Sequence, residues 1–424
     1  MTPSKVHFVG IGGVGMSALA QLYRSKGVRV QGSDRAASPV TKLLTEQGIT
    51  VFEGHDATHV PADTELLVFS DAVPTDNPER VRAQELGIKE QSYFEALGEA
   101  TREGTSIVVS GTHGKTSTTA MIAEVLIETG QRPTVIAGSI LAQQGSNFIE
   151  GDPNLFVIEG CEYKRHFLHL HPDILVLTNI ELDHTDYYHS LEDIQDAFRE
   201  VIAKVPESGT IITDTSSPTI LPVLDHTNAR VVPYQEVHIP KLLAPGRFNT
   251  LNAQAAKAAV LAYNPDLNEG NIEESLQAFR GTWRRFEYKG VTKSGAQLYD
   301  DYAHHPTAIE GTLQMVKQEF PDKRIVVVFH PHLYSRTKSF FDGFVRSLAL
   351  ADEVILLPIY AAREQPDSSV SSEQLVAAIQ EKGTTAQYVE DFDGAAKLLQ
   401  GKKDDTLLLT MGAGDVYQLA RQLL

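Results

Sequence analysis

Short aliphatic runs alternate with helical patterns along the whole sequence, and this alternation restricts the possible folds more than any other feature. Helical patterns lie between the runs, for example at residues 17–27, 118–130 and 250–263. The runs are apolar over nearly their full length, which is typical of parallel strands buried on both faces. Strands that alternate with helices predict an α/β fold with mainly parallel sheets. The expected strands are 5–10, 28–33, 65–70, 106–111, 155–160, 173–180, 209–214, 296–302, 324–330, 352–358 and 406–412.

This pattern forms three blocks within the 424 residues. We expect a Rossmann-like domain at 1–100, a central domain with a phosphate-binding loop at 101–287, and a second Rossmann-like domain at 288–424. Since a domain usually has about 100–200 residues, the length agrees with two to four domains.

Acidic residues outnumber basic ones by 55 to 37, so the formal net charge is −18. This balance argues against nonspecific binding to nucleic acid or to anionic membranes. The apolar runs are shorter than the ~20 residues of a membrane span, and the N-terminal residues lack the apolar core of a signal peptide. The single cysteine, Cys161, cannot form an intrachain disulfide, which fits a reducing compartment. We therefore expect a cytoplasmic protein without membrane insertion.

A first glycine motif, Gly10-x-Gly12-x-x-Gly15, lies between a predicted strand and a predicted helix. Asp34 follows about 20 residues later, after the next strand. This arrangement is typical of a diphosphate bound at a helix N-terminus, because glycines let the backbone approach the phosphates and the helix dipole favours the anion. The motif by itself leaves NAD and other diphosphate ligands, such as UDP-sugars, open.

A second glycine-rich turn follows the predicted strand at 106–111. The common phosphate-loop pattern G-x-x-x-x-G-K-[ST] requires a glycine at position 109, where this chain has Val109. The chain nevertheless has Gly111, Gly114, Lys115 and Thr116 in the turn. Successive backbone N–H groups can point into one concavity there, Lys115 can neutralise phosphates, and the Thr116 hydroxyl can bind Mg²⁺.

Oxygen and nitrogen ligands for such an ion lie at the ends of two further predicted strands. Glu159 lies at the end of one of them with Glu162 just beyond, and Asn179, Asp183 and His184 lie at or just past the end of the other. Because strand carboxyl ends are where sites gather in α/β proteins, we favour Glu159 and His184 as metal ligands. The H-F-L-H-L-H run at 166–171 has no standard zinc spacing and no cysteine pair, so we interpret its histidines as structural.

The order of these motifs resembles the Mur ligases, which are ATP-dependent amide-forming ligases of peptidoglycan precursor synthesis. The resemblance covers essentially the whole chain, and the family has the shorter loop without the early glycine. It implies a UDP-binding, a P-loop ATPase and a C-terminal Rossmann-like domain. The matching segments are G-T-H-G-K-T at 111–116, Glu159, T-N-I-E-L-D-H at 178–184, R-R-F-E at 284–287 and D-D-Y-A-H-H-P at 300–306.

Within the family, the segments at 7–20, 300–306 and 330–337 resemble the members that join L-alanine to UDP-N-acetylmuramate. The resemblance implies that ATP phosphorylates the lactyl carboxylate of UDP-N-acetylmuramate and that the amine of L-alanine then displaces phosphate. ATP and Mg²⁺ are the implied cofactors, UDP-N-acetylmuramate and L-alanine the implied small-molecule partners. The first glycine motif is thereby assigned to the UDP diphosphate rather than to NAD.

The resemblance also implies roles for individual residues. The catalytic set would be Lys115, His184, Arg285 and His304. Mg²⁺ would be held by Thr116, Glu159 and His184. ATP would bind at Gly111, Thr112, His113, Gly114, Lys115, Thr116, Ser117, Asn249, Asn252, Arg285 and Asp301. The UDP substrate would bind at Gly10, Gly12, Gly13, Val14, Gly15, Asp34 and Ser70, and the amino acid at Tyr302, His304 and Arg336.

The chain departs from the family pattern at a few positions. Phe248 replaces the usual histidine before Asn249, which affects the expected adenine contacts. Leu333 stands where some relatives have a second arginine, so a second clamp on the amino-acid carboxylate is either absent or supplied by another residue. Ala303 replaces a frequent glycine. We expect Cys161 to be a small buried filler, since the implied chemistry needs no thiol.

Three other functions compete with this interpretation. A ligase that recycles a preformed peptide onto UDP-N-acetylmuramate would share nearly all the motifs. An NAD-dependent oxidoreductase would use the motif at 10–15 but would give the Lys115 loop no purpose. A catalytically inactive nucleotide sensor is disfavoured by the intact Lys115, Thr116, Glu159 and His184. The sequence allows either a monomer or a homodimer.

Overall fold

The computed structural model describes residues 3–225 and 227–424. By its internal contacts the chain divides into two compact units. The first unit comprises Met1–Ile180, Gln195–Pro240 and Asn252–Ala278, and the second comprises Glu181–Ile194, Lys241–Leu251 and Phe279–Leu424. Two sheets lie in the first unit and one in the second. The α/β class with three mainly parallel sheets is confirmed.

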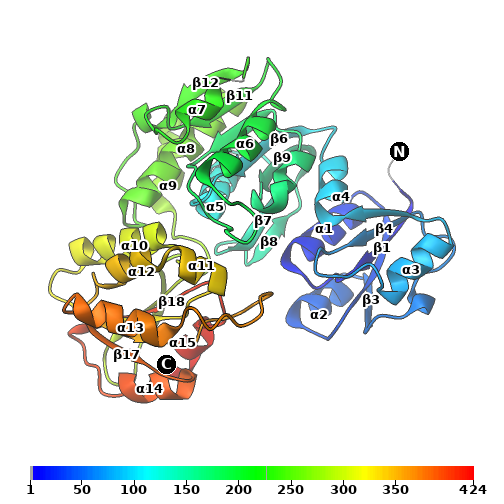
Figure 1. Cartoon of the computed structure of the whole chain (residues 1–424). Coiled ribbons are helices and arrows are strands. Elements are labelled where there is room, and N and C mark those ends of the chain that lie inside the picture. Colours follow the sequence, from blue (N-terminus) through cyan, green and yellow to red (C-terminus); the bar gives the residue numbers. More distant parts are fainter. Residues whose placement is uncertain (1–2, 226) are drawn as a thin grey trace. The chain divides into compact units, whose positions relative to one another are not determined.

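The first sheet is wholly parallel, with the order β3-β2-β1-β4-β5 (Figure 1, blue to cyan). Its strands are β1 (Lys5–Val9), β2 (Arg29–Asp34), β3 (Thr50–Glu53), β4 (Leu66–Phe69) and β5 (Lys89–Ser92). The connecting helices are α1 (Val14–Ser25), α2 (Pro39–Glu46), η1 (Ala57–His59), α3 (Pro78–Glu85) and α4 (Tyr93–Ala100).

The second sheet has the order β12-β11-β10-β6-β9-β7-β8 and is parallel except for the β7–β8 hairpin. Its strands are β6 (Thr105–Ser110), β7 (Pro133–Leu141), β8 (Ser146–Ile149), β9 (Asp152–Glu159), β10 (Ile174–Leu177), β11 (Thr210–Thr213) and β12 (Arg230–Pro233). The helices of this region are α5 (Lys115–Glu128), η2 (Tyr163–His169), α6 (Leu191–Ile202), α7 (Leu221–Leu224), η3 (Tyr234–Glu236), α8 (Arg247–Tyr263) and α9 (Glu269–Ala278).

The third sheet has the order β13-β14-β18-β15-β16-β17 and is parallel except for β13, which pairs antiparallel with β14. Its strands are β13 (Glu287–Val291), β14 (Gln297–Asp301), β15 (Arg324–Phe329), β16 (Glu353–Leu356), β17 (Thr385–Tyr388) and β18 (Thr406–Met411). Its helices are α10 (Pro306–Glu319), α11 (Tyr334–Ser339), α12 (Phe341–Leu348), α13 (Ser372–Glu381), α14 (Phe392–Leu399) and α15 (Tyr417–Leu423).

Burial on both faces explains the apolar runs. In β15, Val327 and Phe329 pack into one hydrophobic cluster while Val326 and Val328 pack into another. Successive side chains of a strand point to opposite faces of the sheet, so the two clusters cover its two sides. All eleven predicted runs form strands.

No helix within residues 3–225 and 227–424 combines the length and the apolar character that crossing a membrane requires.

Candidate functional site

In the first unit, the first glycine motif joins β1 to α1 as predicted. Gly13 precedes the first residue of the helix, Val14, whose side chain is half exposed. A Cβ atom on Gly15 would lie 2.7 Å from the Tyr93 ring, so only glycine permits this packing of α1. A Cβ atom on Gly10 would lie 3.2 Å from the Ser70 Cβ. The structure therefore brings the motif and the end of β4 together.

Asp34 lies at the end of β2 and shapes the same turn. Its Oδ2 accepts a hydrogen bond of 2.8 Å from the backbone N–H of Gly12. The preceding Ser33 donates to the buried carboxylate of Glu79, which also contacts His7 and His59. Despite its burial, these hydrogen bonds and the neighbouring histidines lower the pKa of Glu79 to about 2. A buried polar network thus fixes the strand end that carries Asp34.

The second glycine-rich turn connects β6 to α5, as the sequence predicts. Gly111 has a φ of 130°, in the region that favours glycine. A Cβ atom there would lie 2.2 Å from Thr178 Oγ1 and 2.9 Å from the Asn179 carbonyl oxygen. The turn is therefore pressed against the end of β10, and no larger residue fits at position 111.

Two side chains after β10 hold the backbone of this turn. Asn179 Oδ1 accepts from the His113 N–H at 2.9 Å, and Asn179 Nδ2 donates to the His113 carbonyl at 3.0 Å. The Thr178 hydroxyl donates to the same carbonyl at 2.6 Å, and the Asn179 carbonyl accepts from Thr112 N–H at 3.0 Å. Asn179 thus has a structural role in shaping the phosphate loop.

Lys115, the first residue of α5, is buried against acidic and carbonyl oxygens. Its Nζ lies 2.9 Å from Glu162 Oε2 and donates to the carbonyls of Gly111 and Thr112. Burial opposes the charged form, but the Glu162 carboxylate outweighs it, so the pKa of Lys115 is raised. The ammonium group remains charged and is positioned beside the loop, where a phosphate would need it.

Thr116 and Glu159 come together from α5 and the end of β9. The Thr116 hydroxyl donates to Glu159 Oε1 at 3.0 Å, and Glu159 Oε2 accepts from the Gly138 N–H at 2.7 Å. Neighbouring oxygen ligands of octahedral Mg²⁺ also lie about 2.9 Å apart. The two oxygens therefore have the spacing that a shared magnesium ion needs.

Cys161 lies two residues beyond Glu159 and is partly rather than fully buried, so the expectation of a buried filler needs this correction. Burial of the sulfur, aided by Glu162, raises the pKa of its thiol to about 12. Because the thiolate is the reactive form, this thiol is unreactive at neutral pH. His166, from the neighbouring histidine run, forms an ion pair of 2.7 Å with Asp71, which agrees with its structural interpretation.

In the second unit, Asp183 and Arg336 form a buried ion pair. Arg336 Nε and Nη2 donate to Asp183 Oδ1 at 3.0 and 2.7 Å, and both side chains are about 4% exposed. Asp183 Oδ1 also accepts from the His184 N–H at 2.6 Å. Burial opposes ionisation of Asp183, but the Arg336 charge outweighs it and holds the pKa of that carboxyl well below its usual range. Arg336 is thus already bound to an acid of its own chain.

Aromatic and imidazole rings surround Arg336. Its Nη1 lies 3.3 Å from His332 Nδ1, and the His332 ring stacks on Tyr360. His304 packs edge-on against Tyr302 and contacts the Tyr302 carbonyl through Nδ1 at 2.9 Å. Burial and the Arg336 charge hold the pKa of His304 well below its usual range and lower that of His332 to about 4. Both imidazoles are therefore neutral at pH 7.

Adjacent arginines have different environments before β13 and β14. Arg284 is buried and bonds Asp300 at 2.6 Å and the carbonyls of Gly412 and Gly414 at 2.7 Å, so its role is structural. Arg285 is only partly buried and lies over the Tyr302 ring, 5.0 Å from its centroid. The sequence predicted a ligand for Arg285 alone, and its contact with ATP stays a prediction.

Asp301 ends β14 and accepts backbone hydrogen bonds from Phe286 at 2.8 Å and Ala303 at 2.7 Å. Burial raises the pKa of this carboxyl to about 6. The carboxylate therefore fixes the turn that leads to Tyr302 and His304, and its predicted contact with a ribose stays a prediction.

The start of α8 contains the residues predicted to lie near adenine. Phe248 is 41% exposed, and its ring lies 1.8 Å from where a Cβ atom on Gly311 would be, so the glycine makes room for the ring. Asn249 Nδ2 donates to the Pro245 carbonyl at 2.8 Å. In the first unit, Asn252 Oδ1 lies against Gly114 of the phosphate loop.

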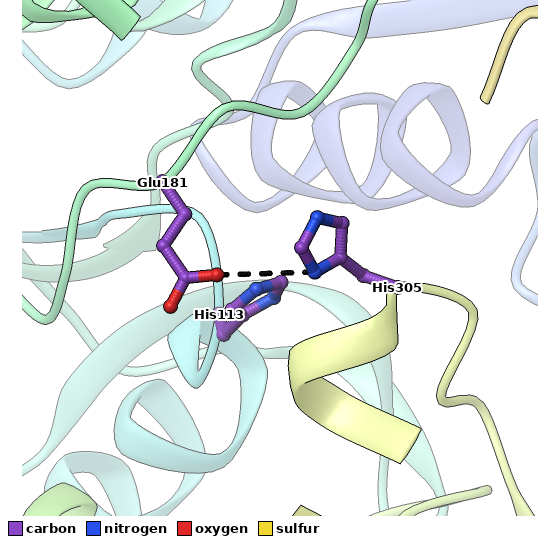
Figure 2. Close-up of side chains that lie close together, drawn as sticks. All are labelled: His113, Glu181 and His305. Carbon is purple, nitrogen blue, oxygen red and sulfur yellow. Dashed lines mark ion pairs between the residues drawn. The ribbon is translucent and has the colours of Figure 1, made fainter. Parts of the chain in front are cut away.

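Helix α10 begins at Pro306, and His305 is its N-cap. Glu181 anchors this start, since its Oε2 accepts from the Thr307 hydroxyl at 2.7 Å and lies 3.8 Å from His305 Nδ1 (Figure 2). The segment that carries Asp183 is thereby tied to α10.

Sequence reasoning did not identify Tyr360, Arg363 or Asp186, which lie near His332, Arg336 and Asp183. Arg363 Nη2 donates to Asp186 Oδ2 at 2.6 Å. Tyr360 and Arg363 follow β16 in an irregular loop without a motif. The sequence indicated their importance only through their position after a buried parallel strand, where ligand sites form in α/β sheets.

Comparisons with known proteins agree with this arrangement of elements. Three family models match consecutive parts of the chain: "Mur ligase family, catalytic domain" at 5–105, "Mur ligase middle domain" at 109–238, and "Mur ligase, glutamate ligase domain" at 284–414. A UDP-N-acetylmuramate–L-alanine ligase of Caldicellulosiruptor saccharolyticus is 37% identical over 99% of this chain and 98% of its own. The chain belongs to the Mur ligase family.

Other Mur ligases show the same full-length similarity. The corresponding ligase of Desulforapulum autotrophicum is 40% identical over 99% of this chain and 98% of its own. The crystal structure of UDP-N-acetylmuramate–alanine ligase from Thermotoga maritima matches with a TM-score of 0.80 and 29% identity, over 99% and 98% of the two chains. A murein peptide ligase from Psychrobacter arcticus has a TM-score of 0.71 at 24% identity, over 99% of this chain and 98% of its own, which shows the shared fold.

The buried pair of Asp183 and Arg336 predicts a coupled loss of stability. Asp183→Asn or Arg336→Met should each lower the free energy of unfolding by about 3–5 kcal/mol, because each leaves a buried charge unpaired. The double variant should lose less than the sum of the two. Urea unfolding followed through Trp283, the only tryptophan, measures this in the second unit.

Acid should remove the effect of Asp183→Asn. The pKa of Asp183 is lowered in the folded chain, so its contribution is present above about pH 4 and is lost as the pH falls through the folded-state pKa. The difference between the wild type and this variant should therefore shrink below pH 4. Asp322→Asn, at an exposed turn of the same unit, is the control and should leave the midpoint of urea unfolding nearly unchanged. Additive losses in the double variant would contradict the pairing.

Proposed function

We propose that this Mur ligase forms an amide bond between the lactyl carboxylate of UDP-N-acetylmuramate and the amine of L-alanine, at the expense of ATP. The observation that carries the proposal is the full-length similarity, at 37–40% identity, to relatives named UDP-N-acetylmuramate–L-alanine ligase. Such a reaction needs a site for ATP and a site for the amino acid. The phosphate loop is the proposed site for ATP, and the residues around His304, His332 and Arg336 are the proposed site for the amino acid.

ATP binds at the loop between β6 and α5. The backbone of Gly111, Thr112, His113 and Gly114 surrounds the phosphates, and Ser117 continues the helix start. Lys115, which stays charged beside this loop, neutralises the terminal phosphates. Arg285, Asn249, Asn252 and Asp301 remain proposed contacts of the nucleotide, with Phe248 beside the base.

The residues of this chain fit a magnesium ion. Thr116 and Glu159 would hold it, since their oxygens are 3.0 Å apart and both belong to ligand types that magnesium prefers. His184 is the proposed ligand of a second ion near the substrate carboxylate. When bound, Mg²⁺ would offset the negative charge of the phosphates.

UDP-N-acetylmuramate binds through its diphosphate at the turn between β1 and α1. Gly10, Gly12, Gly13, Val14 and Gly15 supply this turn, and Asp34 and Ser70 flank it. The N-terminus of a 12-residue helix points at the anion, which suits a diphosphate.

The chemistry consists of two displacements. A carboxylate oxygen of the muramate attacks the γ-phosphorus, the bond to ADP breaks, and an acyl phosphate forms. The amine of L-alanine then attacks the acyl carbon, and phosphate leaves with the former carboxylate oxygen. His304 is neutral and can accept a hydrogen bond that orients the attacking amine, and Tyr302 and Arg336 are the other proposed contacts of the amino acid.

Several less specific properties belong to the same proposal. The domain boundaries are 1–100, 101–287 and 288–424, the site of action is the cytoplasm, and the chain works as a monomer or a homodimer. Peptide recycling and NAD-dependent oxidoreduction are not favoured by the full-length relatives.

Phosphate release tests the function directly. With ATP, Mg²⁺ and UDP-N-acetylmuramate, we expect release that depends on free L-alanine, because the amine completes the turnover. The tripeptide L-Ala-D-Glu-meso-diaminopimelate serves as the alternative acceptor, and a reaction without acceptor as the blank. Release only with the tripeptide would assign the chain to peptide recycling, and release with neither would refute the proposal.

A matched pair of glycine variants tests the phosphate loop. Both Gly111 and Gly130 have a positive φ, but an added Cβ atom meets nothing within 4 Å at Gly130 and meets Thr178 at 2.2 Å at Gly111. Gly111→Ala should weaken ATP binding at least tenfold, as measured by calorimetric titration, whereas Gly130→Ala should retain it. Equal affinities in the two variants would place the nucleotide elsewhere.

A further inference from the structure

The loop between β16 and α13 lies along the segment that precedes α11. The Leu333 N–H donates to the Tyr360 carbonyl at 2.9 Å, and the Tyr360 N–H donates to the Pro331 carbonyl at 2.8 Å. The Ser335 N–H donates to the Glu364 carboxylate at 3.1 Å. These bonds fix Arg363, which lies between Tyr360 and Glu364, beside the segment that carries His332 and Arg336.

Two arginines donate hydrogen bonds to acidic residues of the short segment 183–186. Arg336 binds Asp183, and three residues later Asp186 Oδ2 accepts from Arg363 Nε at 3.0 Å and Nη2 at 2.6 Å. Arg336 contacts the His332 ring directly, with its Nη1 3.3 Å from His332 Nδ1. Tyr360, which stacks on the same ring, precedes Arg363 by three residues, so the loop of Arg363 packs against His332.

The two arginines differ in what they can offer a ligand. Arg336 is about 4% exposed and has Asp183 and His332 as neighbours, whereas the side chain of Arg363 is 47% exposed. Leu333 is 1% exposed and carries no charge. Of these two guanidinium groups, that of Arg363 therefore has the larger accessible surface.

A free amino acid brings a carboxylate to its binding site, and its amine must be left available for attack. Guanidinium groups bind carboxylates through paired, charge-assisted hydrogen bonds, which also fix the orientation of the bound group. We propose that Arg363 binds the α-carboxylate of the amino-acid substrate and acts beside Arg336 as the second carboxylate clamp that Leu333 cannot provide. This inference rests on the proposed ligase function and specifies how its acceptor is recognised.

The test compares L-alanine with L-alaninamide, which has the same amine but no carboxylate. In the wild type we expect kcat/KM to favour L-alanine strongly. In Arg363→Ala the KM for L-alanine should rise about 10- to 100-fold, because a charge-assisted hydrogen bond to the substrate is lost. The KM values for ATP and UDP-N-acetylmuramate should change little. The preference for L-alanine over the amide should fall by the same factor.

Further variants separate binding from structure. Arg363→Lys keeps the positive charge but lacks the paired N–H donors of the guanidinium group, so it should give an intermediate KM for L-alanine. Arg346→Ala, at an exposed position of α12 in the same unit, should behave as the wild type. If Arg363→Ala and Arg363→Lys keep the wild-type preference for L-alanine over the amide, the inference is wrong while the ligase function stands. If the wild type itself releases no phosphate in response to L-alanine, the proposed ligase function is wrong, whatever the Arg363 variants show.

Discussion

Burial of parallel strands on both faces is the constraint on which the rest of this structure depends. Interior strands such as β6, β10 and β18 are almost entirely buried and contain no charged side chain. Charged groups of the site therefore lie at the strand ends or in the turns after them, and the carboxyl ends of parallel strands lie at one edge of their sheet. Glu159 ends β9, and Lys115, Asp183 and Arg336 follow β6, β10 and β15 in the sequence.

The same constraint explains which strands the sequence predicted. Double burial requires a nearly continuous apolar run, and this signal identified the interior strands of all three sheets except β7. Within the described chain, the missed strands β3, β5, β8, β12, β13 and β17 are the sheet edges, and their residues are mostly exposed or half buried. An edge strand is paired on one side only, so its sequence is not forced to be apolar.

The candidate site residues also differ in how well the sequence could predict them. The phosphate loop was predictable because its glycines, Lys115 and Thr116 are consecutive and their spacing is set by one strand-turn-helix unit. The ion pair of Arg336 with Asp183 joins residues 153 positions apart, which no local pattern encodes. Arg363 was likewise missed, since only the bonds between its loop and the α11 segment bring it to the pocket.

The acyl phosphate is the central part of the proposed function, because it explains why one chain would need both a phosphate loop and a binding site for an amino acid. The most direct measurement uses UDP-N-acetylmuramate with ¹⁸O in its lactyl carboxylate, together with ATP and L-alanine. We predict that one ¹⁸O atom per turnover appears in the released phosphate, as found by mass spectrometry. Phosphate without ¹⁸O, or release of AMP and pyrophosphate, would contradict the account.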